Sequence, residues 1–223
     1  MIRLGKVGAS RNGNADETAL PLRLDKLNGV IRTTGIAEYW EAMSRGQVFI
    51  ASTPVTGVAP GTTAASNLPP FALTNPPNSG VAAILVDAEI AFVSGTLGAG
   101  NIILAGAQNQ NINPFQLGQI AVGATDAGPK PGLTGLGVRS ACWAMNNPLL
   151  SVNATLIRPL WSTGQFISNG NLYFGDAHHD SDGYLAVMPG GALCFLNAGG
   201  AGTLARVMFS MAWIEVPVAE VNP

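Results

Sequence analysis

Charged residues are scarce in this 223-residue sequence: Lys, Arg, Asp and Glu make up 11% of it, whereas an ordinary soluble domain contains about 25%. The net charge is −2, which excludes a general electrostatic attraction to nucleic acid. Hydrophobic residues reach 47%, yet no apolar run attains the roughly 20 residues that a transmembrane helix needs. We therefore expect no membrane span, and a chain that hides apolar surface in contacts between subunits.

Cysteine and aromatic residues are also few. Cys142 and Cys194 stand in the apolar segments SACWAM and GALCFLN, without a partner at metal-ligand spacing. We expect two buried thiols in a protein made in a reducing cytosol; a disulfide between them is the alternative. Aromatic residues make up 7% of the chain. The four tryptophans are scattered, which is more typical of core or interface residues than of a sugar site: Trp40, Trp143, Trp161 and Trp213.

Glycine and proline are plentiful, at 28 and 15 residues, and they divide the chain into short apolar runs. The clearest case is FALTNPPNSGVAAILVDAEIAFVSGTLGAGNIIL, residues 71–104. This pattern indicates antiparallel strands joined by tight connections. Residues 84–93 alternate in character, which predicts a strand with one face in a core. The face expected in the core consists of Ile84, Val86, Ala88, Ile90 and Phe92.

The opposite face of that strand is where we expect a second copy of the chain. Its apolar members Leu85, Ala91 and Val93, together with Trp213, are the predicted subunit interface. Asp87 and Glu89 interrupt this face, which weakens the prediction.

Further strands are predicted along the rest of the chain, eight to ten in all. Residues 184–188 and 192–197, separated by Pro189-Gly190-Gly191, indicate a tight hairpin. Segment 37–46 is ambiguous between a helical turn and a strand, and 118–137 is predicted to be a long exposed loop. The remaining predicted strands are 47–52, 101–106, 153–160, 164–174 and 205–218. Their spacing predicts an all-β, jelly-roll-like antiparallel β-sandwich.

The N-terminal part differs from the rest in charge. Residues 1–46 contain seven of the 11 Lys and Arg residues. We interpret the start of the chain as an extended arm, because four leucines between residues 20 and 27 would be unnecessary in a solvated tail; a frayed tail is the alternative. The predicted organisation is an arm and linking segment over 1–53, followed by the sandwich over 54–223. The basic residues expected to carry the arm's contacts are Arg3, Lys6, Arg11, Arg23 and Lys26.

One polar cluster, DAHHDSDG at 176–183, contains both histidines. It resembles a fragment of a calcium loop but lacks the closing glutamate. A solvated turn is the favoured interpretation, and an ion bridge is the alternative, with His178, His179, Asp180 and Asp182 as weak candidate ligands. The sequence contains no G-x-S-x-G elbow and no phosphate loop. We therefore expect neither catalysis nor a cofactor.

Three segments taken in order resemble jelly-roll structural proteins of tailed bacteriophages, including capsid cement (decoration) proteins. They are residues 37–52, 71–102 and 190–218, about a third of the chain. The resemblance implies a homotrimer on the exterior of the virion, bound to the major capsid protein and using its N-terminal arm. The expected function is thus non-enzymatic capsid stabilisation. The alternative is a receptor- or glycan-binding head of a tail fibre or spike, and a third, less favoured, is an enzyme of the cupin or hydrolase type.

Overall fold

The computed structural model describes residues 39–61, 66–108, 125–135, 137–163, 177–199 and 202–221. Contacts divide the chain into two compact units, Met1–Trp40 and Glu41–Pro223. The elements below belong almost entirely to the second unit. None of its described helices has the length and apolar character needed to cross a membrane. The predicted arm lies outside the described residues.

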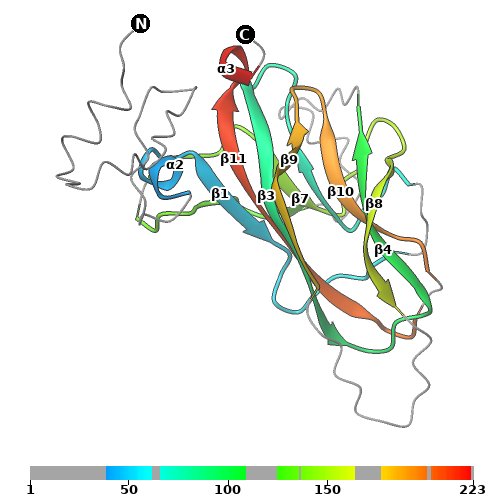
Figure 1. Ribbon diagram of the computed structural model, residues 1–223. Helices are drawn as coiled ribbons and strands as arrows, with labels where there is room; N and C mark the ends of the chain where they lie inside the picture. Colours follow the sequence, from blue (N-terminus) through cyan, green and yellow to red (C-terminus); the bar gives the residue numbers. More distant parts are fainter. Residues whose placement is uncertain are drawn as a thin grey trace, which may run out of the picture. The chain divides into compact units, whose positions relative to one another are not determined.

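Two antiparallel sheets form a β-sandwich (Figure 1), which confirms the predicted all-β class. One sheet has five strands in the order β6-β1-β11-β3-β9, and the other has six in the order β5-β7-β2-β10-β4-β8. The strands are β1 (Val48–Ser52), β2 (Phe71–Thr74), β3 (Val81–Ser94), β4 (Gly100–Ala107), β5 (Thr125–Asp126), β6 (Lys130–Pro131), β7 (Trp143–Asn146), β8 (Thr155–Thr163), β9 (Ala177–Val187), β10 (Ala192–Asn197) and β11 (Arg206–Pro217). The jelly-roll connectivity stays a prediction.

Several boundaries differ from those expected. The ambiguous segment 37–46 contains a helical turn, α2 (Trp40–Ser44), and a second turn, α3 (Val218–Val221), follows β11. Strand β1 pairs with β11 over its whole length, so the sandwich starts before residue 54. The expected loop over 118–137 contains β5 and β6, which pair with β7 and β1 respectively.

Strand β11, predicted as a strand over 205–218, keeps one alternation of buried side chains along its length. Every second residue faces the interior: Val207, Phe209, Met211 and Trp213 are buried in the central core. Aromatic rings join the two layers there. Phe195 of β10 stacks on Phe209 of β11 in the other sheet, with ring centroids 4.7 Å apart. Within the five-stranded sheet, Phe49 of β1 stacks on its partner Trp213 of β11 at 6.2 Å. Such pairs add to the stability that apolar burial provides.

Strand β3 reverses its alternation halfway along. Against β11, Leu85 pairs with Trp213 and Asp87 pairs with Ala212, so Val86 is an extra residue in β3. Such a bulge turns every later side chain to the other face. The interior residues are therefore Val81, Ala83 and Leu85 before the bulge, and Ala88, Ile90 and Phe92 after it.

The predicted core face of this strand is consequently half right. Ala88, Ile90 and Phe92 do face the interior, whereas Ile84 and Val86, expected beside them, do not belong to the core and are only partly buried. The sequence pattern alone carries no mark of the inserted residue, because apolar side chains stand on both phases in this half of the strand.

The connections before β3 and before β10 pass from one sheet to the other, so the predicted hairpin at Pro189-Gly190-Gly191 is wrong. Strand β2 lies in the six-stranded sheet and β3 in the five-stranded sheet; β9 and β10 are divided in the same way. Asn75 joins the two corners. Its Nδ2 donates to Val81 O at 2.8 Å and to Val187 O at 2.7 Å, and backbone hydrogen bonds join it to Gly190 and Gly191.

At the opposite end, the connections from β3 to β4 and from β10 to β11 also cross between sheets and pack on each other. Thr96 N donates to Thr203 O, and Thr203 N donates to Thr96 Oγ1, both at 3.0 Å. A Cβ atom on Gly202 would lie 1.6 Å from Thr96 O. The two backbones therefore lie too close together for any residue other than glycine at position 202.

The outer face of the six-stranded sheet is buried too. A second apolar cluster covers it, comprising Ala72, Ile103, Ala105, Ala107, Leu150, Ala154, Ala192, Cys194 and Leu196. Loop residues cover this face: Leu150 N donates to Asn67 O at 2.7 Å, and Asn197 Nδ2 donates to Gly61 O at 3.0 Å. Burial on both faces explains why all six residues of β10 are buried and why no alternation shows in its sequence.

Candidate functional site

A buried carboxylate stands at the end of the interior row of β11. Glu215 follows Trp213 on the same face and is 8% exposed. Its Oε2 accepts from Ala141 N at 2.9 Å, and its Oε1 accepts from Cys142 N at 3.1 Å and from Trp213 Nε1 at 3.2 Å. The Ser140 hydroxyl also donates to Oε1. Buried carboxylates need such donors, because desolvation is otherwise costly.

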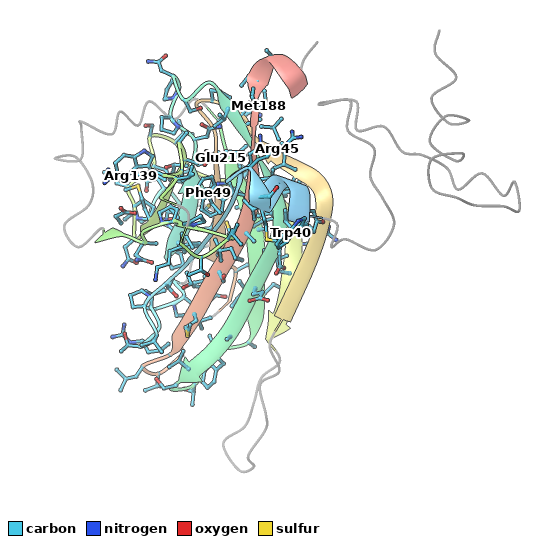
Figure 2. The ribbon with its side chains drawn as sticks, turned by 90° about the vertical axis from the view of Figure 1, so that its left-hand side faces the viewer. Trp40, Arg45, Phe49, Arg139, Met188 and Glu215 are labelled. Atoms are coloured by element: carbon cyan, nitrogen blue, oxygen red, sulfur yellow. The ribbon has the colours of Figure 1, made fainter. Side chains whose placement is uncertain are left out.

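These bonds fix the segment that leads into β7. The two backbone N–H groups and the hydroxyl all belong to residues 140–142, whereas the carboxylate belongs to β11 in the other sheet. Glu215 therefore joins the sheets at this end of the sandwich. Figure 2 shows Glu215 and Arg139 in the half of the molecule nearer α3.

Sequence reasoning missed Glu215 and Ser140, although one signal was present. In RVMFSMAWIEVP the apolar phase runs through Val207, Phe209, Met211 and Trp213, and Glu215 falls on that same phase. A charged residue on the buried phase of a strand indicates a satisfied carboxylate inside the fold.

The two thiols are buried, as predicted, and no disulfide joins them. Burial, and then the neighbouring Glu215 carboxylate, raise the pKa of the Cys142 thiol far above its ordinary value. Burial raises the pKa of Cys194 to about 12. Both therefore remain protonated at neutral pH, and a protonated thiol is a poor nucleophile.

A pocket of about 300 Å³ lies beside this network. One side is the connection between β5 and β6, and the other is the segment entering β7. The residues that line it are Asp126, Gly128, Pro129, Arg139, Ser140, Cys142 and Trp143. Trp143 is half-buried, and the two charged residues are exposed.

The segment expected to form a polar turn is part of a strand instead. His178, His179 and Asp180 belong to β9, where His178 pairs with Glu89 and Asp180 with Asp87 of β3. Their side chains, like that of Asp182, lie outside the described residues. Within the described residues, no group of three or more potential ligands is placed to hold a metal ion.

The predicted subunit interface is not one surface. Leu85 and Trp213 are fully buried in the core of the chain itself, so the prediction is wrong for both; the bulge in β3 explains the first. Ala91 is half-buried, and Val93, near the end of β3, is exposed. The predicted arm contacts, Arg3, Lys6, Arg11, Arg23 and Lys26, lie outside the described residues.

No protein-family model matches the chain, and neither the curated proteins nor the solved structures contain a match to it.

Proposed function

We propose that this chain is a non-enzymatic virion structural protein, a homotrimeric cement protein on the exterior of a tailed-phage capsid. Its partners would be two further copies of itself and the major capsid protein. The support from the sequence is the resemblance over residues 37–52, 71–102 and 190–218, together with the low charge of 11%.

The observation that carries the proposal is a run of exposed apolar side chains at one edge of the six-stranded sheet. Strand β8 is the last strand of that sheet. Leu156 is 59% exposed and Ile157 is 44% exposed, and Leu149 and Val152 just before them are exposed as well. Concentrated apolar exposure is typical of a protein interface, and an edge strand offers unpaired backbone groups to a partner.

The mechanism would be mechanical. Each subunit covers its apolar edge with another copy, and the trimer then spans neighbouring capsid subunits. Because three linked copies bind together, the trimer dissociates far more slowly than one copy would. The arm over residues 1–28 would add shell contacts, so its deletion should abolish shell binding and leave the trimer intact.

The first test is the copy number in purified particles, measured by quantitative mass spectrometry. A cement protein is present in many copies, at a fixed ratio to the major capsid protein, whereas a spike is present in few. A low copy number would overturn the cement proposal in favour of the receptor-binding head.

The oligomer can be tested separately with the purified chain. Native mass spectrometry should give three times the 22.9 kDa of one chain. Leu156→Glu should dissociate the trimer, because a carboxylate would be desolvated in the interface. The matched control is Val55→Glu, which changes a residue that is 78% exposed and lies in the connection between β1 and β2. A monomeric wild-type chain would contradict the proposal.

The receptor- or glycan-binding head remains the second candidate, because one observation favours it. The pocket beside Glu215 combines an indole, a guanidinium and a carboxylate, which are groups that sugar-binding sites use.

A further inference from the structure

The pocket between the β5–β6 connection and the entry to β7 has the properties of a preformed small-ligand site. Its volume of about 300 Å³ is at the lower end of the range for such sites, about 300–1,000 Å³. It would thus accommodate a single small ring rather than a polymer segment.

Both walls are held in place by interactions behind the pocket. Glu215 fixes residues 140–142 through hydrogen bonds to two backbone N–H groups and the Ser140 hydroxyl. On the other wall, Asp126 Oδ1 accepts from Gly128 N at 2.8 Å, and Ala127 N donates to Ala144 O at 2.8 Å. A wall held in this way needs little reorganisation on binding.

Three polar groups at the pocket are available to a ligand. In the described part of the chain, the guanidinium of Arg139 forms no ion pair or hydrogen bond, and the indole N–H of Trp143 finds no acceptor. Asp126 uses one carboxylate oxygen in its turn, which leaves the other as an acceptor. All three residues line the same pocket.

We propose that this pocket binds a sugar residue that carries a carboxylate, such as a uronic acid unit. The planar guanidinium of Arg139 matches a carboxylate in two parallel hydrogen bonds. The free oxygen of Asp126 accepts from ring hydroxyls, and the Trp143 indole offers an apolar face and an N–H donor. This site goes beyond the cement role, because a capsid-bound trimer would display it toward acidic surface polysaccharides.

The experiment is calorimetric titration of the full chain with two probes, methyl glucuronide and methyl glucoside. The glucuronide should bind at least about tenfold more tightly, because hydrogen bonds to charged groups are the strong ones. Equal binding of the two probes, or binding of neither, would overturn the proposal.

Variants locate the site. Arg139→Gln should remove the preference for the glucuronide, and Asp126→Asn should weaken both probes. Arg206→Gln is the matched control, since Arg206 is an exposed arginine of β11 that does not line the pocket. Unchanged affinity in Arg139→Gln, with the same melting temperature as the wild type, would contradict the assignment. Trp143→Phe, which keeps an aromatic face but loses the indole N–H, should show a smaller loss than Asp126→Asn.

Discussion

The two ends of the sandwich hold their sheets together in different ways. At the end nearer α3, a buried side-chain amide, Asn75, donates to both sheet-to-sheet connections. At the other end, the connections before β4 and β11 pack backbone against backbone where Gly202 meets Thr96, and the Thr96 backbone and hydroxyl form hydrogen bonds with Thr203. One end thus depends on hydrogen bonds from a buried amide, and the other requires that position 202 carry no side chain.

This contrast predicts that the glycine end is the less tolerant of substitution. In Gly202→Ala the new Cβ would meet a backbone oxygen at 1.6 Å, which no side-chain rotation can relieve. We expect a loss of about 3–5 kcal/mol in the free energy of unfolding, measured by urea denaturation. Gly137→Ala is the control, because nothing lies within 4 Å of its Cβ position. Equal stability of the two variants would remove the distinction between the ends.

The amide end should respond through hydrogen bonding. Asn75→Ala leaves two carbonyl groups, Val81 O and Val187 O, without this donor, and we expect a loss of about 2–4 kcal/mol. Asn78→Ala is the matched control, since Asn78 is exposed in the same connection. Denaturation of both variants measures the difference; a loss no larger than in the control would show that Asn75 does not hold the corners.

The second device at the amide end, Glu215, should have a smaller effect when its shape is kept. Glu215→Gln retains an acceptor but places an NH₂ group among N–H donors. We expect about 1–3 kcal/mol of destabilisation, and Glu89→Gln, at an exposed position of β3, should change stability little. Thermal and urea denaturation test this, and a fully neutral Glu215→Gln would contradict the assigned role.

The smallest expected effect is in the reactivity of the two thiols. Because their pKa values are raised, both stay protonated in the folded chain at pH 8, so neither should react with a thiol reagent until the chain unfolds. An unfolded thiol ionises at lower pH, so stability should also fall as the pH rises above 9.

The rate at which each thiol reacts with a thiol reagent can also report on local opening of the fold. Cys142 lies at the amide end, next to Trp143, whose carbonyl accepts from Thr74 Oγ1. In Asn75→Ala its reaction rate should therefore rise more than that of Cys194, whose surroundings lie on the outer face of the sheet. Mass spectrometry of partially modified chains distinguishes the two sites. Equal acceleration would indicate global unfolding rather than opening at one end.

Local patterns predicted the elements of this fold better than their connections. The strand at β11 was predicted, but its buried face was not, because Trp213, expected at a subunit interface, belongs to the interior row of the chain itself. In β3 the strand was predicted, but its buried face was wrong before the bulge, since apolar residues occupy both phases there. The turn at Pro189-Gly190-Gly191 was predicted, but the sequence did not show that the strand after it joins the other sheet.

The candidate site shows the same division. The burial of the two cysteines followed from their apolar neighbours, whereas the polarity of segment 176–183 predicted a turn where the structure has strand β9. However, the pocket brings residues of the 125–131 segment close to residues 139–143, and Glu215 reaches them from the other sheet. No spacing in the sequence indicates that contact.

The sequence by itself determined the all-β class, most strands and the burial of the thiols, because these depend on the character and period of neighbouring residues. Tertiary structure alone decided which sheet each strand joins, where β3 changes phase, and which groups meet at Asn75, Gly202 and Glu215. The physical reason is that these features arise from contacts between segments far apart in the chain. Local sequence preferences do not distinguish between the possible arrangements of those segments, so a single hydrogen bond or a single missing Cβ decides between them.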